Sequence, residues 1–173
     1  MNQTIECMLS RRSVKKYKSD PVPKELIQTV ANAGIHAASG LNMQAPIVLA
    51  ITDKELIQKL SKLNAGDDPF HRADPFYGAP CVLVVLADKK VATRVYDGSL
   101  VMGNMLLAAH SLGLGACWIH RARETFETDE GKAILKTLGI EGEYEGIGNC
   151  ILGYADMTPA DKPRKENRIY YID

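Results

Sequence analysis

The sequence predicts an α+β fold, in which a central mixed or antiparallel sheet is surrounded by helices. Short apolar, β-rich runs and longer segments with helical apolar spacing both occur, without the strict strand-helix-strand alternation of a parallel α/β protein. The predicted helices also hold more of the chain than the predicted strands. With 173 residues, the chain is long enough for one complete hydrophobic core and too short for two ordinary domains. Residues 1–173 are therefore expected to form a single domain.

The first half of the chain predicts two helices, a strand and a third helix. Apolar residues recur at helical spacing in the helices, and the strand is a short β-rich run between Pro46 and Asp53. Asp53 is placed to cap the third helix. In chain order these elements are expected over residues 4–12, 24–40, 47–52 and 53–63.

The second half predicts a long loop, three more strands and two more helices. The loop, residues 64–79, contains Phe70, Phe76 and Tyr77, and either covers a binding site or packs at a subunit interface. The later elements are expected over 81–87 (strand), 91–112 (buried helix), 116–119 (strand), 129–138 (helix) and 149–154 (strand). Beyond Ala155 the chain is polar and then closes with apolar residues 169–172, which predicts an extended arm whose end packs on a partner subunit.

Composition excludes several classes of function. Lys plus Arg and Asp plus Glu both number 21, so no overall field favours nucleic acid or an anionic membrane. The apolar stretch 100–119 is interrupted by polar residues and glycines and is a poor membrane span. The four histidines and four cysteines lack metal-site spacing, and no hydrolase or dinucleotide-binding motif is present. The N-terminus has no signal-peptide core, so a cytoplasmic protein with reduced thiols is expected.

A basic cluster near the N-terminus has the chemistry of a phosphate site. It consists of Arg11, Arg12, Ser13, Lys15 and Lys16. Arginine offers forked donors, lysine a point charge and serine a hydroxyl donor, which together suit an anion. The alternative is a solvated basic helix end that complements the helix dipole.

Two further segments have polar side chains suited to a ligand. Residues 38–44 combine small residues with Ser39, Asn42 and Gln44, which suits the polar edge of a planar heterocycle, or simply a helix end and loop. Residues 162–165 form a second basic cluster, which either closes on the same anion as the first or is a solvated tail.

Four motifs taken together resemble the nitroreductase family. They are RRSVK at 11–15, ASGLNMQ at 38–44, GLGACWI at 113–119 and KPRK at 162–165, and they occur in the family's order over nearly the whole chain. The resemblance implies a homodimer with extended termini and with flavin mononucleotide (FMN) in clefts at the subunit interface. It also implies an oxidoreductase that transfers hydride from NADH or NADPH through flavin N5 to nitroaromatics or quinones by a ping-pong mechanism.

The resemblance assigns expected roles in binding FMN. Arg11 and Ser13 are expected at its phosphate and ribityl chain with help from Arg12, and Lys15 near the flavin N1 and O2 edge. A fixed cation there stabilises the negative charge of reduced flavin. The partner protomer is expected to supply Ser39, Gly40, Asn42 and Gln44, and Lys162 and Arg164 to close over the phosphate. No acid or base side chain is needed, because the cofactor supplies the reactivity.

The chain departs from the family pattern at three places. Ala38 stands where proline is common, Ala45-Pro46 replaces a Pro-Trp pair, and residues 119–121 replace the Glu-Gly motif that larger members place opposite the flavin. These departures leave open the rigidity of the loop, one wall of the pocket and which backbone amide faces the flavin N5. A separate alternative is a non-catalytic flavin-binding or sensor protein that keeps the fold but lacks an efficient nicotinamide site. Outside flavin chemistry, a small domain that binds an acidic partner is the other alternative.

Overall fold

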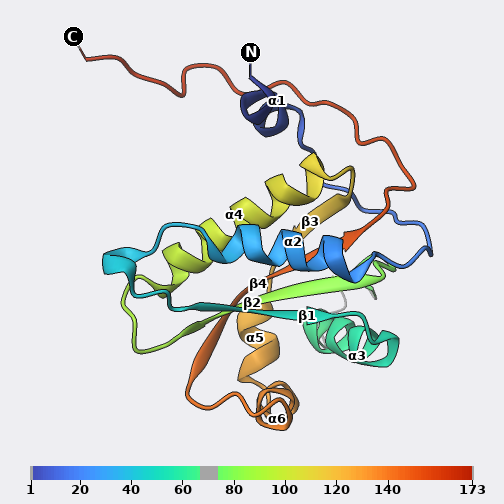
Figure 1. The fold of residues 1–173 in the computed structure, drawn as a ribbon, viewed down its shortest axis with the longest axis vertical. Helices are drawn as coiled ribbons and strands as arrows, with labels where there is room; N and C mark the ends of the chain where they lie inside the picture. Colours follow the sequence, from blue (N-terminus) through green and yellow to red (C-terminus); the bar gives the residue numbers. More distant parts are fainter. Residues whose placement is uncertain (1, 67–73, 173) are drawn as a thin grey trace.

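The computed structural model describes residues 2–66 and 74–172. Within them lie six α-helices, a short 3-10 helix and four β-strands (Figure 1). In chain order these are α1 (Gln3–Ser10), α2 (Lys24–Ile35), η1 (Gly40–Asn42), β1 (Pro46–Ile51), α3 (Lys54–Ala65), β2 (Cys81–Asp88), α4 (Arg94–Ser111), β3 (Gly115–Ile119), α5 (Ala122–Glu127), α6 (Asp129–Thr137) and β4 (Tyr144–Gly153).

The four strands form one antiparallel sheet in the order β1-β2-β4-β3. Strand β2 is central and is covered on both faces, which is why its residues are apolar without alternation. The register between β2 and β4 shifts between Val85 and Leu86, so β4 bends where Gly146 and Gly148 lie. The expected α+β architecture, with an antiparallel sheet surrounded by helices, is confirmed.

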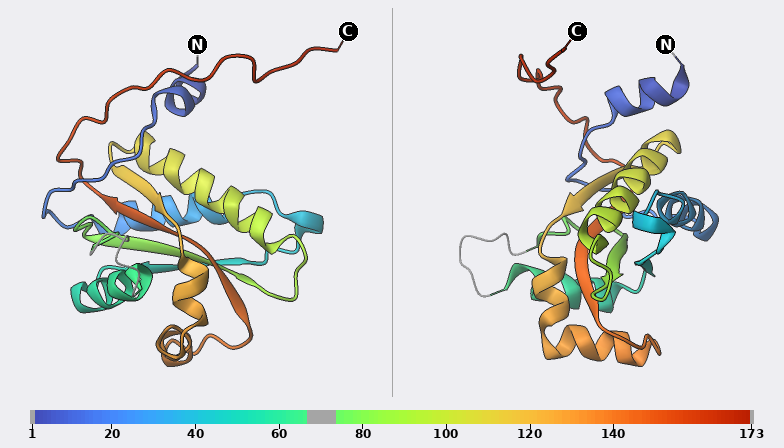
Figure 2. Two further views of the ribbon diagram at one scale, coloured as in Figure 1. Left: turned by 180° about the vertical axis from the view of Figure 1, so that it is seen from behind. Right: turned by 90° about the vertical axis from the view of Figure 1, so that its left-hand side faces the viewer.

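Helices cover both faces of the sheet, and each face has its own apolar core. Helices α2 and α4 pack on one face, and α3, α5 and α6 lie on the other (Figures 1 and 2). Met102 and Met105 of α4 are fully buried in the first core, and Leu60 of α3 and Phe76 in the second. Most of the stabilisation from apolar burial therefore lies in these two layers.

Helix α1 and the C-terminal arm stand away from both cores. Helix α1 has no buried residue and contacts mainly α4, and the arm runs past it after leaving β4 (Figure 2). From Ala160 onward every described residue of the arm is exposed. The sequence prediction of an extended arm is confirmed.

Three sequence predictions about the elements were wrong in part. Helix α2 ends at Ile35 rather than at Ser39-Gly40, and residues 36–45 form a loop that contains η1. Strand β4 begins at Tyr144 rather than at Asn149, because its first half contains two glycines that weaken the β pattern. Helix α5 was not expected, since it is only six residues long.

The expected loop 64–79 is only partly described. Residues 64–65 belong to α3, Phe70 lies outside the described residues, and Pro75 to Gly78 form a turn. Phe76 is 1% exposed and packs in the core, so it cannot form part of a lid. Tyr77, by contrast, is only half-buried.

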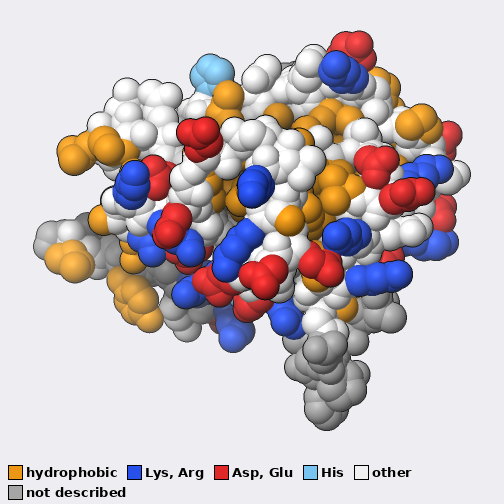
Figure 3. Space-filling model, turned by 90° about the horizontal axis from the view of Figure 1, so that it is seen from below, with side chains coloured by type: hydrophobic (Ala, Val, Ile, Leu, Met, Phe, Trp, Pro, Cys, Tyr) orange, Lys and Arg blue, Asp and Glu red, His pale blue; other side chains and the backbone are white. Residues whose placement is uncertain are grey.

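The surface agrees with the even charge balance. Lys and Arg side chains are interspersed with Asp and Glu on the face seen in Figure 3, without a large area of one sign. Among the described residues, no helix combines the length and apolar character needed to cross a membrane.

Gly146 provides a test of how closely α5 approaches the sheet. A Cβ at this position would lie 2.2 Å from the carbonyl of Ala122. The atoms that this Cβ would meet belong to the backbone of α5 and cannot move aside easily. Gly146→Ala is therefore expected to lower the free energy of unfolding by about 3 kcal/mol. Gly139→Ala adds the same methyl group in open space at a φ of +69°, so it should cost only about 1 to 2 kcal/mol. Urea unfolding measures both, and equal losses would contradict the close approach.

Candidate functional site

The N-terminal basic cluster lies along the edge of the sheet. The amide of Val14 donates to the carbonyl of Ala116 in β3 at 3.1 Å, and Ser13 pairs with Ala116 in an isolated parallel bridge. This approach is possible because Gly115 has no side chain: a Cβ there would lie 2.9 Å from Cβ of Val14. Strand β3 therefore sets the position of Arg11, Ser13 and the residues that follow.

The same segment pairs on its other side with the chain after β4. The amide of Lys18 donates to Tyr154 O at 2.9 Å, and the amide of Asp156 donates to Lys16 O at 3.0 Å. The Nζ of Lys16 lies 2.7 Å from a carboxylate oxygen of Asp156 and holds the pKa of that carboxyl below its usual value. The start of the arm and the basic segment are thus fixed side by side.

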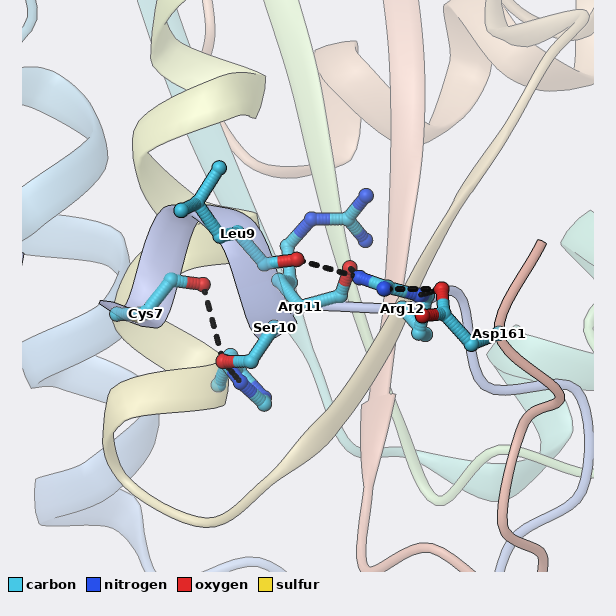
Figure 4. A network of polar contacts seen from close by, with 7 residues as sticks. Cys7, Leu9, Ser10, Arg11, Arg12 and Asp161 are labelled. Atoms are coloured by element: carbon cyan, nitrogen blue, oxygen red, sulfur yellow. Dashed lines mark hydrogen bonds and ion pairs between the residues drawn. The ribbon is translucent and has the colours of Figure 1, made fainter. Parts of the chain in front are cut away.

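Arg12 is occupied by partners within the chain. Its Nη1 donates to the carbonyls of Leu9 at 2.7 Å and Arg11 at 2.9 Å, and its Nε donates to Asp161 at 2.9 Å (Figure 4). The hydrogen bond and charge of Arg12 lower the pKa of the Asp161 carboxyl. In this arrangement Arg12 anchors the arm and has fewer donors left for a phosphate than its sequence position alone indicates.

Arg11 is the opposite case. It follows the last turn of α1 with extended backbone angles, so its side chain leaves on a different side from that of Arg12 (Figure 4). Its Nη1 is buried and, among the described residues, has no hydrogen-bond partner. A buried guanidinium donor without an acceptor is costly, and an anionic group bound beside it would satisfy that donor.

The arm brings the second basic cluster near the first. Lys162 follows Asp161 directly and Arg164 comes two residues later, and the charge of Arg164 contributes to the lowered pKa of the Asp161 carboxyl. Both side chains are exposed. Arg12 and Asp161 thus place the two basic clusters in one neighbourhood, which sequence alone could not show.

The polar group at residues 39–44 is a tightly turned loop. Leu41, Asn42 and Gln44 all have positive φ angles, between 49° and 55°. The amide of Gln44 donates to Oγ of Ser39 at 3.1 Å, and its Nε2 donates to Oδ1 of Asn42 at 3.2 Å. Such strained backbone is retained where the surroundings enforce it and is common at functional sites.

Asp97 holds this loop to α4, and sequence reasoning missed it. It is 3% exposed, accepts from the amide of Gly40 at 3.0 Å and accepts from the hydroxyl of Thr93 at 2.8 Å. A Cβ on Gly40 would lie 2.6 Å from Oγ1 of Thr93. An acidic residue inside an otherwise apolar helix was the available signal. A hollow of about 440 Å³ between α2 and β1 is lined in part by Ser39 and Gln44.

Within one chain, the loop 39–44 and the helix that leads into the basic segment contact opposite ends of α4. The loop at Gly40 is bound to Asp97 in the first turn, whereas Sγ of Cys7 in α1 donates to Leu107 O at 3.4 Å. Ten helical residues separate these points, or about 15 Å at the rise of an α-helix. The structure therefore brings together Arg11, Ser13, Lys15 and the arm, but not these residues and 39–44.

Other reactive groups are poor candidates for chemistry. Burial raises the pKa of the Cys81 thiol to about 12 and raises that of Cys150 further. These thiols are therefore neutral and unreactive at neutral pH. Within residues 2–66 and 74–172, no three His, Cys, Asp or Glu side chains are grouped so that they could hold a metal ion.

The fold and the sequence both match known proteins. The family model described as the nitroreductase family matches residues 8–72 and 65–154. An NADPH-flavin oxidoreductase of Vibrio harveyi is 30% identical over 175 residues, which cover 95% of this chain and 70% of that protein. Nitroreductases with bound FMN from Bacteroides fragilis and Desulfitobacterium hafniense have TM-scores of 0.89 and 0.90, with 26% and 27% identity over the full length of both chains.

The match to the family model spans most of the chain, and the order of the four motifs agrees with it. The chain belongs to the nitroreductase family.

Asp97 can be tested as the anchor of the loop. Asp97→Ala should leave the Gly40 amide and the Thr93 hydroxyl without their acceptor, and lower the free energy of unfolding by about 2 to 4 kcal/mol. Asp97→Asn keeps one carbonyl oxygen in the same place and should lose less than half as much. Urea unfolding of the two variants measures the difference, and equal stability of Asp97→Ala and the unmodified protein would refute the role.

The contact between Arg12 and Asp161 predicts a pH dependence of the arm. A carboxyl whose pKa is lowered on docking favours docking fully above its ordinary value of 3.8 and loses this contribution as the pH falls through the lowered pKa. Titration of the carboxyl ¹³C resonance should give a midpoint below 3.8 for Asp161, and Arg12→Met should return it to about the ordinary value. Asp156, whose pKa is lowered chiefly by Lys16, is the internal control and should not move.

Proposed function

We propose that the protein transfers hydride from NADH or NADPH through bound FMN to electron-poor acceptors such as nitroaromatics and quinones, by a ping-pong mechanism. The observation that carries the proposal is the buried Nη1 of Arg11, which has no hydrogen-bond partner in the described part of the chain, in a chain of this family. The relatives named above are an NADPH-flavin oxidoreductase and nitroreductases with bound FMN. These names support FMN and a nicotinamide reductant for this chain as well.

The residues present fit FMN. Arg11 would supply a charged donor for the phosphate and Ser13 a hydroxyl for the phosphate or ribityl chain. Lys162 and Arg164, whose arm Asp161 holds near the basic segment, would close over the phosphate. Arg12 contributes by fixing the arm through Asp161. Lys15 supplies a cation for the N1 and O2 edge of the flavin. When bound, FMN would supply the redox chemistry, which is hydride transfer between the nicotinamide and the acceptor.

The protein's own residues bind, orient and tune the cofactor. In this proposal the partner protomer supplies Ser39, Gly40, Asn42 and Gln44, because their loop is bound to the first turn of α4, whereas α1, which leads into the basic segment, contacts α4 near its other end, about 15 Å along the helix. Both groups are expected at the ribityl chain, and each protomer would supply one of them. The site is complete only in a homodimer.

The exposed apolar surface supports the same dimer. Helix α1 has no buried residue, and its Met8 and Leu9 are 48% and 59% exposed. Tyr96 and Leu100 lie on the outer face of α4, and residues 169–172 of the arm are largely exposed. An amphipathic helix, an apolar stripe on a neighbouring helix and an apolar arm would all be covered by a second copy of the chain.

Two measurements test the proposed activity. Protein reconstituted with FMN should consume NADH or NADPH when a nitroaromatic or a quinone is added, and initial rates at several acceptor concentrations should give the parallel double-reciprocal lines of a ping-pong mechanism. Failure to oxidise either nicotinamide with any acceptor, despite bound FMN, would indicate a flavin-binding protein without reductase activity. Failure to bind FMN would reject the proposed function.

Substitution of Arg11 tests how much its phosphate contact contributes to FMN binding. Arg11→Ala should remove a charge-assisted hydrogen bond of about 1.5 to 3 kcal/mol and weaken FMN binding about tenfold or more. Lys16→Ala changes the net charge equally but removes a side chain paired with Asp156, so its effect should be less than threefold. Fluorescence titration with FMN measures both. Equal losses would show that general charge, not the contact of Arg11, determines binding.

A further inference from the structure

The backbone of Lys15 is fixed by its neighbours, and its side-chain ammonium lies over an aromatic ring. Its amide contacts Sδ of Met157 at 3.4 Å, and its neighbour Val14 is bonded to β3. The side chain itself is exposed. Its Nζ lies over the ring of Tyr77, 5.8 Å from the ring centroid, which is within the range of a cation–π interaction.

Asp74 fixes the turn that contains Tyr77. Asp74 accepts from the amides of Phe76 at 3.0 Å and Gly78 at 2.7 Å, and from the hydroxyl of Ser61 at 2.7 Å. These bonds enclose the backbone of Tyr77, which has a φ of +55° although it is not glycine. Such a conformation is unfavourable for a bulky residue and persists only when the surroundings impose it.

The neighbours of Tyr77 fix which way its ring can point. Phe76 is buried in the core beneath the turn. The chain reverses at Tyr77, so the Tyr77 side chain points away from that core and toward Lys15. The ring is half-buried and packs at the margin of the same core. It therefore offers a rigid surface to the flexible Lys15 side chain, which otherwise has free rotation about four bonds.

We propose that Tyr77 is a positioning residue for Lys15, whose ammonium it holds at the edge of the FMN site so that the charge favours reduced over oxidised cofactor. This inference rests on the proposed function. Tyr77 acts through Lys15: the ring restricts the ammonium, and the ammonium offsets the negative charge that FMN gains on reduction. The aromatic turn after the third helix thereby acquires a role that does not require it to cover the acceptor.

The first experiment uses the protein without FMN and tests the contact itself. The ε-CH₂ protons of Lys15, assigned by comparison with Lys15→Met, should show an upfield ring-current shift. The shift should persist in Tyr77→Phe, which keeps the ring, and vanish in Tyr77→Leu, which keeps a bulky residue on the same strained backbone. Unchanged Lys15 resonances in Tyr77→Leu would overturn the proposal whether or not FMN binds.

The second experiment measures the two-electron midpoint potential of bound FMN in a double-mutant cycle. Tyr77→Leu should reduce the preference for reduced FMN two- to fivefold, a shift of about 10 to 20 mV to more negative potential. Tyr77→Phe should stay within about 5 mV of the unmodified protein. In a Lys15→Met background, Tyr77→Leu should have no further effect, because the charge it positions is gone.

The outcomes separate this inference from the proposed function. If Tyr77→Leu shifts the potential equally with and without Lys15, or not at all while Lys15→Met does shift it, Tyr77 does not act through Lys15. If Lys15→Met leaves the potential unchanged, Lys15 is not at the flavin and the inference fails with that assignment. Absence of FMN binding would reject the proposed function, while the resonances of Lys15 would still decide the contact with Tyr77.

Discussion

The arrangement of the candidate site depends on the seating of Val14 against Gly115. One backbone hydrogen bond to Ala116 and the absence of a side chain at Gly115 allow the basic segment to lie directly on the edge of β3. Residues 16–18 continue the contact on the chain that leaves β4. Because one contact is to strand β3 and the other to the residues directly after β4, the side chains before and after Val14 have fixed positions. A loop tethered only at its ends would not define them so closely.

This seating also divides the cations of the basic cluster into two kinds. Arg12 and Lys16 are paired with Asp161 and Asp156 and serve to hold the arm. Arg11 and Lys15 have no carboxylate partner among the described residues: the first carries a buried donor without an acceptor and the second lies over a ring. Composition could not make this division, because adjacent residues of the same type have opposite roles. The alternation follows from the extended backbone, which directs successive side chains to different sides.

The sequence predicted the elements whose pattern is set by burial. Strand β2 was recognised because nearly all of its residues face a core, and α4 because its apolar run is too long for a strand. Helix α3 was recognised because Asp53 caps it, a role confirmed by its contact with the amide of Leu56 at 2.8 Å. The first half of β4 was missed because Gly146 is required by the close approach of α5, and a glycine carries no β signal. At such positions a tertiary contact determines the residue, so its local propensity does not predict the strand.

The candidate site was predicted less completely than the fold, for a related reason. Motif order identified residues 11–15 and 39–44, but the anchors Asp97 and Tyr77 became evident only from the contacts they make across the chain. Neither anchor has a sequence neighbour in the site. Long-range positioning of this kind depends on how α4 and the turn after α3 are packed, and no spacing along the chain encodes it.

The length of α4 explains both why loop 39–44 lies away from the basic segment and why the apolar residues of α1 are exposed. The helix spans the molecule, with the loop at Gly40 attached near its beginning and α1 near its end. In a two-fold dimer built along this helix, the beginning of one α4 can approach the end of the other, so that each loop meets the basic segment of the partner. The same placement covers the apolar residues of α1, which no core of its own chain receives. In the proposed dimer, the separation of the two groups within one chain would let two chains form two equivalent sites.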